Sequence, residues 1–215
     1  MELRRTANAG VLLKLDGISI LMDGVCREVK PYPATSPEER ARLENGFPDI
    51  LLFTHTHKDH YDPGFAAAFQ RQTNGVILGS EDIRGAVQKK TKVGNVCITT
   101  IPSRHIGAAG KTTPHVSFLV EGTQCVWFVG DSSPLQWKGR DDLPRPDVLI
   151  VPYAYANTPS GWAATKALQP KKIVLLHMPK REEDTVGLWN AVETIVGMPL
   201  PENFYAPDMG ETIYI

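Results

Sequence analysis

Residues 55–60 read HTHKDH, which places three histidines and one aspartate within six positions. Imidazole nitrogen and carboxylate oxygen are ligands that suit zinc, iron or manganese, and this segment offers no thiolate. The segment directly follows the apolar run DILLF at residues 49–53, which predicts a short buried strand. A loop that leaves a buried strand can turn tightly and direct alternate side chains toward one point. The spacing therefore indicates a metal site, and a polar turn with solvated histidines is the less specific alternative.

Three further candidate ligands follow predicted strands elsewhere in the chain. His105, Asp131 and His177 lie just beyond apolar runs at residues 96–101, 125–129 and 173–176. Functional sites of sheet-based α/β proteins collect at such carboxyl ends of strands. Five of the six histidines follow this one rule of placement, which unrelated surface histidines would not do. Gly130, just before Asp131, allows the backbone to turn sharply there.

Strand and helix signals alternate along the chain and define the elements that must position these residues. The strand-like runs at 11–15 and 18–22 are joined by Asp16-Gly17, a strong signal for a hairpin. Further strands are predicted at residues 76–78, 116–120, 148–151 and 212–215, and helices at 36–46, 64–72, 80–89, 158–168 and 184–196. This mixture indicates an α/β protein whose helices cover the faces of its sheets. No linker is long enough to split the chain, so we expect one domain over residues 1–215.

Composition and charge narrow the function classes. The chain has 23 basic and 24 acidic residues and a formal net charge of -1, so it lacks the positive charge typical of nucleic-acid binding. Lys14 and Asp16 interrupt the apolar stretch near the N-terminus, which does not read as a signal peptide, and no apolar run is long enough to span a bilayer. The three cysteines form no CxxC pair. We therefore expect a cytoplasmic protein that acts on a small soluble molecule, without nucleic-acid or membrane partners.

The order of these motifs resembles the metallo-β-lactamase superfamily: HTHKDH, then His105, then Gly130-Asp131 after a strand, then His177. The opening AGVLLKLDGISILMDG is similar to that family's first hairpin, which ends in an acidic residue, here Asp23, and the closing PDMGETIYI is similar to its last strand. The resemblance covers nearly the whole chain. It is greatest to the branch that holds ascorbate-6-phosphate lactonase-like and N-acyl-phosphatidylethanolamine phospholipase D-like hydrolases. It implies a four-layer αβ/βα sandwich, with two mixed β-sheets face to face, helices on the outer faces and a dinuclear metal site at one edge.

The resemblance also implies a ligand set and roles for its members. One metal ion would be held by His55, His57 and His105, the second by Asp59, His60 and His177, and Asp131 would bridge both. His115 lies ten residues after His105 and is the alternative third ligand of the first metal. Otherwise it would support the ligands from behind or donate a proton to the leaving group. His57 stands where the oxygen-reducing diiron branch has a glutamate, which argues against redox chemistry.

Two such ions can share a water molecule and lower its pKa from about 16 to about 7, so that hydroxide forms at neutral pH. We expect this bridging hydroxide to attack a small ester, lactone or phosphodiester, while Asp59 and Asp131 hold the nucleophile and move its proton. Amides and thioesters stay open as substrates.

Zinc is the expected metal, and Mn2+ or Fe2+ is compatible with the same ligands. Tyr153, Tyr155 and Asn157 follow the predicted strand at residues 148–151 and are candidates to line the pocket. The sequence leaves the oligomeric state open. The alternative function is a non-catalytic domain of the same fold, stabilised by metal, that binds a ligand or partner.

Overall fold

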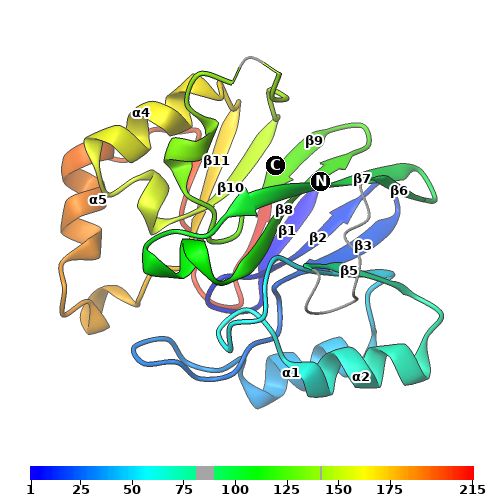
Figure 1. The fold of residues 1–215 in the computed structure, drawn as a ribbon. Coiled ribbons are helices and arrows are strands. Elements are labelled where there is room, and N and C mark those ends of the chain that lie inside the picture. The colour runs from blue at the N-terminus through cyan, green and yellow to red at the C-terminus, as the bar shows by residue number, and fades with distance from the viewer. Residues whose placement is uncertain (81–89, 141) are drawn as a thin grey trace.

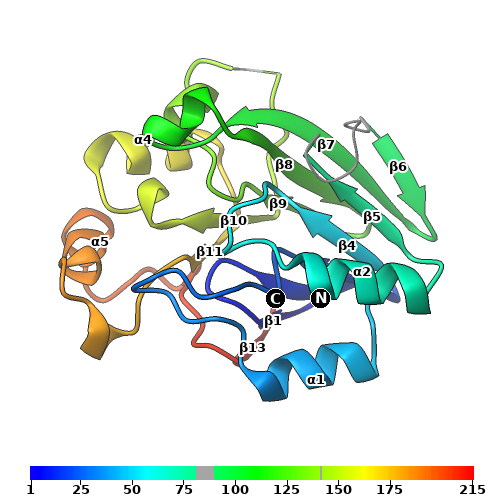
Figure 2. The same cartoon turned by 60° about the horizontal axis from the view of Figure 1, so that its bottom comes forward.

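The computed structural model describes residues 1–80, 90–140 and 142–215, and two mixed β-sheets face each other within it (Figures 1 and 2). The six-stranded sheet consists, in spatial order, of β13 (Thr212–Tyr214), β1 (Glu2–Arg5), β2 (Val11–Leu15), β3 (Ile18–Met22), β4 (Ile50–Phe53) and β5 (Val76–Gly79). The seven-stranded sheet consists of β12 (Phe204–Tyr205), β11 (Lys172–Leu176), β10 (Val148–Pro152), β9 (Cys125–Phe128), β8 (Pro114–Glu121), β7 (Val96–Arg104) and β6 (Lys90–Val93). Strands β3 to β5 are parallel, as are β9 to β12, and the other neighbouring pairs are antiparallel.

The main core lies between the two sheets. Successive side chains of a strand point to opposite faces, so each strand contributes alternate residues to this core. In β4, Ile50 and Leu52 belong to the cluster shared with the seven-stranded sheet, whereas Leu51 and Phe53 pack on the opposite side, under helices. Strands β10 and β11 alternate in the same way between the shared cluster and a second outer cluster. Both faces of these strands are therefore buried, which explains why their sequences are continuously apolar.

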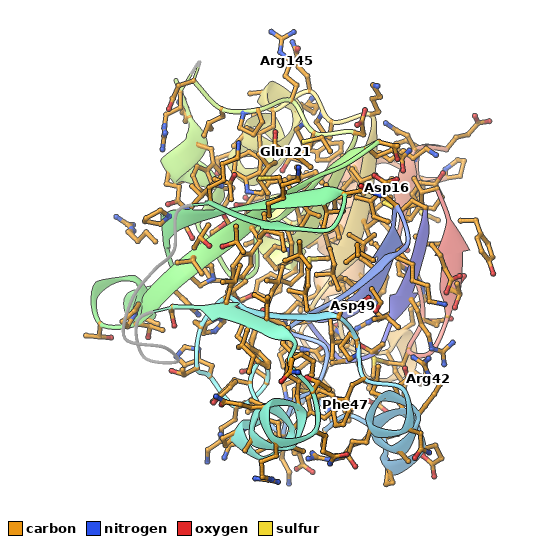
Figure 3. The ribbon with its side chains drawn as sticks, turned by 90° about the vertical axis from the view of Figure 1, so that its right-hand side faces the viewer. Asp16, Arg42, Phe47, Asp49, Glu121 and Arg145 are labelled. Atoms are coloured by element: carbon orange, nitrogen blue, oxygen red, sulfur yellow. The ribbon has the colours of Figure 1, made fainter. Side chains whose placement is uncertain are left out.

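Helices cover the outer face of each sheet. Figure 2 shows α1 (Pro37–Asn45) and α2 (Pro63–Gln72) against the six-stranded sheet, and α4 (Pro159–Ala167) and α5 (Leu188–Val196) against the seven-stranded one. Figure 3 looks along α1 and α2, where the ring of Phe47 lies 5.5 Å from that of Phe65 and 5.8 Å from that of Phe69. Single turns of 3-10 helix occur at Ala108–Lys111, Pro134–Trp137, Tyr153–Tyr155 and Arg181–Glu183. The layers form the expected αβ/βα sandwich.

Local sequence signals set the ends of these helices. A side-chain oxygen just before the first turn of α1, α2 and α4 accepts a backbone N–H, and a proline follows it in each case; these caps are Ser36, Asp62 and Thr158. Helix α5 differs from the prediction that it begins at Asp184. It begins at Leu188, and the Asp184 carboxylate accepts the backbone N–H groups of Leu188 and Trp189 from outside the helix.

The Asp16-Gly17 hairpin forms as predicted. Asp16 and Gly17 have φ values of 52° and 82°, the positive values that a type I′ turn requires. The Asp16 carboxylate then accepts hydrogen bonds of 2.6 Å from both the backbone N–H and the hydroxyl of Thr123, in the loop between β8 and β9. The two hairpin tips are thereby joined, with Asp16 close to Glu121 in Figure 3.

Some strands carry no clear signal in the sequence. β1, β6 and β12 were not expected, and β7 extends three residues beyond the predicted strand, to Arg104. β6 reads KTKV and lies at the edge of its sheet, where lysines discourage pairing with another chain. The helix predicted from Ser80 falls on residues 81–89, outside the described part of the chain. Within the described residues, no helix has the length and apolar character needed to cross a membrane.

Candidate metal centre

The candidate residues meet at one edge of the sandwich because of the direction of the strands. β7, β9 and β11 all run the same way in the seven-stranded sheet, so His105, Asp131 and His177 emerge at the same edge. β4 of the facing sheet ends at the same place and delivers residues 55–60. β8 runs in the opposite direction, so its second residue, His115, also lies at this edge, with its ring 5.0 Å from that of His55.

Two groups of three side chains are close enough to hold a metal ion each. In both groups the candidate ligand atoms lie within 4.8 Å of one another; the groups are His55 with His57 and His105, and Asp59 with His60 and His177. Asp131 lies beside both groups. Its Oδ2 is 3.7 Å from Nε2 of His105 and 3.4 Å and 3.5 Å from Nε2 of His60 and His177.

Several of these polar atoms are buried without a hydrogen-bond partner among the described residues. They are the Nε2 atoms of His55, His60, His105, His115 and His177, together with Oδ1 of Asp131. A buried polar atom without a partner costs about 1–3 kcal/mol, so six of them around one point would be strongly destabilising. Divalent cations fit this donor set of imidazole nitrogens and carboxylate oxygen, and would remove that cost.

The opposite nitrogen of each of these five rings, Nδ1, is held by the surrounding structure. The partners of Nδ1 are Thr54 Oγ1 for His55 at 2.9 Å, Asp23 Oδ2 for His60 at 2.8 Å, the Ile106 carbonyl for His105 at 2.8 Å, Ser103 Oγ for His115 at 2.7 Å and Asn8 Nδ2 for His177 at 3.3 Å. A contact in which Nδ1–H donates to an oxygen orients a metal-binding imidazole and leaves Nε2 free for the ion; for His177 this requires the Asn8 amide turned so that its oxygen faces Nδ1. His57 differs, since its Nε2 contacts Thr113 Oγ1 at 3.3 Å.

Asp23 is a further residue of this site that was not among the predicted ligands. It is fully buried, and its carboxylate accepts the backbone N–H of Thr54 at 2.8 Å, the Thr54 hydroxyl at 2.6 Å and Nδ1–H of His60 at 2.8 Å. Asp23 also lies close enough to His55 and His60 to form a third metal-like group. Because both of its oxygens are already used, we interpret it as a positioning residue. Its signal in the sequence was the acidic end of the first hairpin.

His177 is held in an unusual backbone conformation. Its φ is 58°, in the left-handed region that residues other than glycine rarely adopt. Its backbone N–H donates to the Asn8 carbonyl at 3.1 Å, and the buried Arg5 guanidinium donates to the carbonyls of Asn8 and Met178. Tyr32 adds a perpendicular ring contact with His177 at 4.5 Å between centroids. Asn8, Arg5 and Tyr32 had no recognisable motif in the sequence.

Burial and charge shift the pKa values of this cluster in opposite directions. Burial lowers the pKa of His55 and His57, and lowers that of His115 to about 3. Burial would raise the pKa of Asp131, but the nearby His177 and His60 hold it well below its usual range. Asp131 is therefore an ionised carboxylate in a buried setting, as a ligand for cations must be.

Comparisons with known proteins agree with this geometry. The model of the Beta-lactamase superfamily domain matches residues 2–177. A UPF0173 metal-dependent hydrolase from Methanopyrus kandleri is 24% identical over 225 residues, which cover 91% of this chain and 93% of that protein. Another from Salinibacter ruber is 24% identical over 202 residues, covering 82% and 84%.

Solved structures share the same architecture. Isothiocyanate hydrolase from Delia radicum gut bacteria has a TM-score of 0.70 at 16% identity, covering 100% of this chain and 99% of that one. This likeness concerns the fold. Since the family model spans most of the chain, the chain belongs to the metallo-β-lactamase superfamily and is a metal-dependent hydrolase of that fold.

Proposed function

We propose that residues 1–215 form a single-domain hydrolase with two metal ions, most readily zinc, that cleaves a small ester, lactone or phosphodiester. In this proposal His55, His57 and His105 hold one ion, Asp59, His60 and His177 hold the other, and Asp131 is shared. The support is the set of five buried ligand atoms that have no hydrogen-bond partner among the described residues, Nε2 of His55, His60, His105 and His177 and Oδ1 of Asp131, which come from four separate segments of the chain. The two ligand groups have no residue in common, which favours two ions over one.

His105 is preferred over His115 as the third ligand of the first ion. His105 belongs to a three-residue group with His55 and His57, whereas His115 belongs to none of the groups found among the described residues. The ring of His115 lies beside those of His55 and His105, with centroids 5.0 Å and 5.6 Å away. It is therefore available for a role other than that of a ligand.

When bound, a pair of divalent cations supplies an activated water molecule and polarises the bond under attack. The protein's own side chains then have to move the protons. The Asp59 and Asp131 carboxylates both lie near the His177 Nε2 atom, at 3.3 Å and 3.5 Å, and in this proposal they hold the nucleophilic water and accept its proton. In the tautomer in which Ser103 donates to Nδ1 of His115, Nε2–H of His115 is a hydrogen-bond donor for the departing oxygen.

Elemental analysis of the purified protein and a substrate panel test this function. We expect about two metal ions per chain and metal-dependent turnover on at least one of a set of generic esters, lactones and bis(p-nitrophenyl) phosphate. His57→Ala and Asp131→Ala should each abolish turnover, whereas Asp49→Ala, at the far end of β4, should retain it. Tight metal binding without turnover on any class would instead identify a metal-stabilised binding domain. Near-wild-type turnover in either ligand variant would refute the assignment.

A further inference from the structure

A cavity of about 240 Å³ adjoins the candidate metal centre. Its lining is apolar or aromatic at Pro31, Tyr32, Tyr153, Pro179, Val186 and Leu188, and polar at Glu183, Asp184 and Thr185. It is assembled from three distant segments, namely the loop after β3, the turn after β10 and the segment from β11 to α5. An apolar cavity of roughly 150 Å³ is sufficient for benzene, so this one has room for an aryl group or a short alkyl chain.

Two tyrosine rings connect this cavity with the metal centre, because each lines the cavity and contacts the ring of His177. The ring of Tyr32 is perpendicular to that of His177 at 4.5 Å between centroids, and the ring of Tyr153 lies 5.8 Å from the same histidine at 74°. Both tyrosines line the cavity. A molecule with its reacting bond beside His177 can therefore extend a substituent past these rings into the cavity.

The charge of the cavity excludes one class of substituent. Among its described lining residues there is no lysine or arginine, and its charged members are Glu183 and Asp184. The Asp184 carboxylate is occupied by backbone N–H groups at the start of α5. Lys180 forms an ion pair with Glu183 at 3.4 Å and lines the neighbouring cavities instead of this one. A phosphate or carboxylate placed here would find no buried cation to compensate its desolvation.

We propose that this cavity, which we call the tyrosine pocket, binds an uncharged apolar substituent of the substrate and selects esters or lactones with such a substituent over those whose substituent carries a carboxylate or phosphate. This inference rests on the proposed hydrolase function and specifies its substrate class. Val186, which is 74% exposed, adds an exposed apolar side chain to the lining of the pocket. Tyr32, Tyr153 and Val186 are then the residues that determine specificity.

A matched pair of esters tests the selection in the zinc-loaded full chain. The probes are 4-nitrophenyl hexanoate and mono(4-nitrophenyl) adipate, which differ only by a carboxylate in place of the terminal methyl group. Each enzymatic rate is divided by the spontaneous rate of the same ester. We expect kcat/KM for the hexanoate to exceed that for the adipate about tenfold or more. Equal values, or a preference for the adipate, would overturn the inference while leaving the hydrolase function intact.

A charge variant locates the selection in the pocket. Val186→Arg adds a cation at a highly exposed position, and it should lower the hexanoate-to-adipate ratio about five- to tenfold. Met198→Arg is the matched control, because Met198 is also an exposed apolar residue but lies beyond the other end of α5. The ratio should stay at the wild-type value in this control. An equal change in both variants, or no change in either, would refute the pocket assignment.

A binding measurement separates failure of the pocket from failure of hydrolysis. Hexanamide and adipamate are the uncleaved counterparts of the two esters, and saturation-transfer NMR measures their binding to the chelator-treated full chain. Tighter binding of hexanamide, with the difference reduced by Val186→Arg, supports the pocket even if no ester is cleaved. Equal binding of both amides would overturn it. Absence of metal-dependent cleavage of every ester would then count only against the hydrolase function.

Discussion

Asp23 offers the sharpest test of how the metal centre is held, through the substitution Asp23→Asn. Three donors point at its two carboxylate oxygens: the backbone N–H and hydroxyl of Thr54, and Nδ1–H of His60. Asparagine keeps one acceptor oxygen and replaces the other by an NH2 group that can only donate. In either orientation of the amide, at least one buried donor therefore faces another donor.

The cost of this substitution follows from the hydrogen bonds lost. A buried donor left without its acceptor costs about 1–3 kcal/mol, and a charge-assisted bond is worth more than a neutral one. We therefore expect the free energy of unfolding to fall by roughly 2–4 kcal/mol. Loss of the contact that orients a metal-binding imidazole lowers metal affinity about 10–100-fold. His60 should therefore hold zinc correspondingly less tightly.

Asp49→Asn is the matched control, because Asp49 joins the same two strands at their other end. Its carboxylate accepts the backbone N–H and the hydroxyl of Ser19 at 2.8 Å and 2.6 Å, but in an exposed position (Figure 3). Urea unfolding of the chelator-treated proteins measures the free energy, and competition with a zinc chelator measures the affinity. The control should lose less than about 1 kcal/mol and retain its zinc affinity. If Asp23→Asn matched the wild type in both assays, the role assigned to Asp23 would be wrong.

Three further perturbations address the surroundings of the site, its metal and the fold. A Cβ added at Gly130 would lie 2.6 Å from Thr54 Cγ2 at a φ of +52°, so Gly130→Ala should lower zinc affinity about tenfold. Titration calorimetry measures this, and Gly139→Ala, at a similar φ with open space around it, should not change affinity. Removal of metal by a chelator should lower Tm by several degrees, because the buried Nε2 atoms of the imidazoles would then have no partner. An unchanged Tm in scanning calorimetry would argue against bound metal. Burial raises the pKa of Glu39, but Arg42 and Arg4 outweigh it and hold that pKa below its usual value of 4.5. The stabilisation from Glu39 is thus present above that pH and lost as the pH falls below it, so urea midpoints from pH 6 to pH 3 should fall more steeply for the wild type than for Glu39→Gln, and parallel curves would contradict this.

Local features of the fold were predictable because they depend on neighbours in the chain. The positive φ of Asp16 and Gly17 follows from the needs of a two-residue hairpin turn. Helix starts at Ser36 and Thr158 follow from side-chain oxygens that satisfy backbone N–H groups within three residues. β6 was not predictable, because its few apolar side chains leave no alternation to detect, and its pairing with β7 decides its conformation.

The candidate ligands were also visible in the sequence, because a metal site needs particular residue types and because each follows an apolar strand. Which of them lie close together depended on strand order and direction, since β4 comes from one sheet and β7, β9 and β11 come from the other. His115 reaches the same edge only because β8 runs against its neighbours.

The sequence by itself determined which candidate ligand atoms are available: nitrogen and oxygen donors, placed where strands end. Only the tertiary structure decided what supports and surrounds those donors. Asn8 meets His177 across 169 positions of the chain, and Asp23 meets His60 across 37. Contacts of such separation arise from the packing of whole sheets, which no local pattern of residues encodes. The tyrosine pocket has the same origin, because its walls come from segments that are adjacent only after the two sheets have closed on each other.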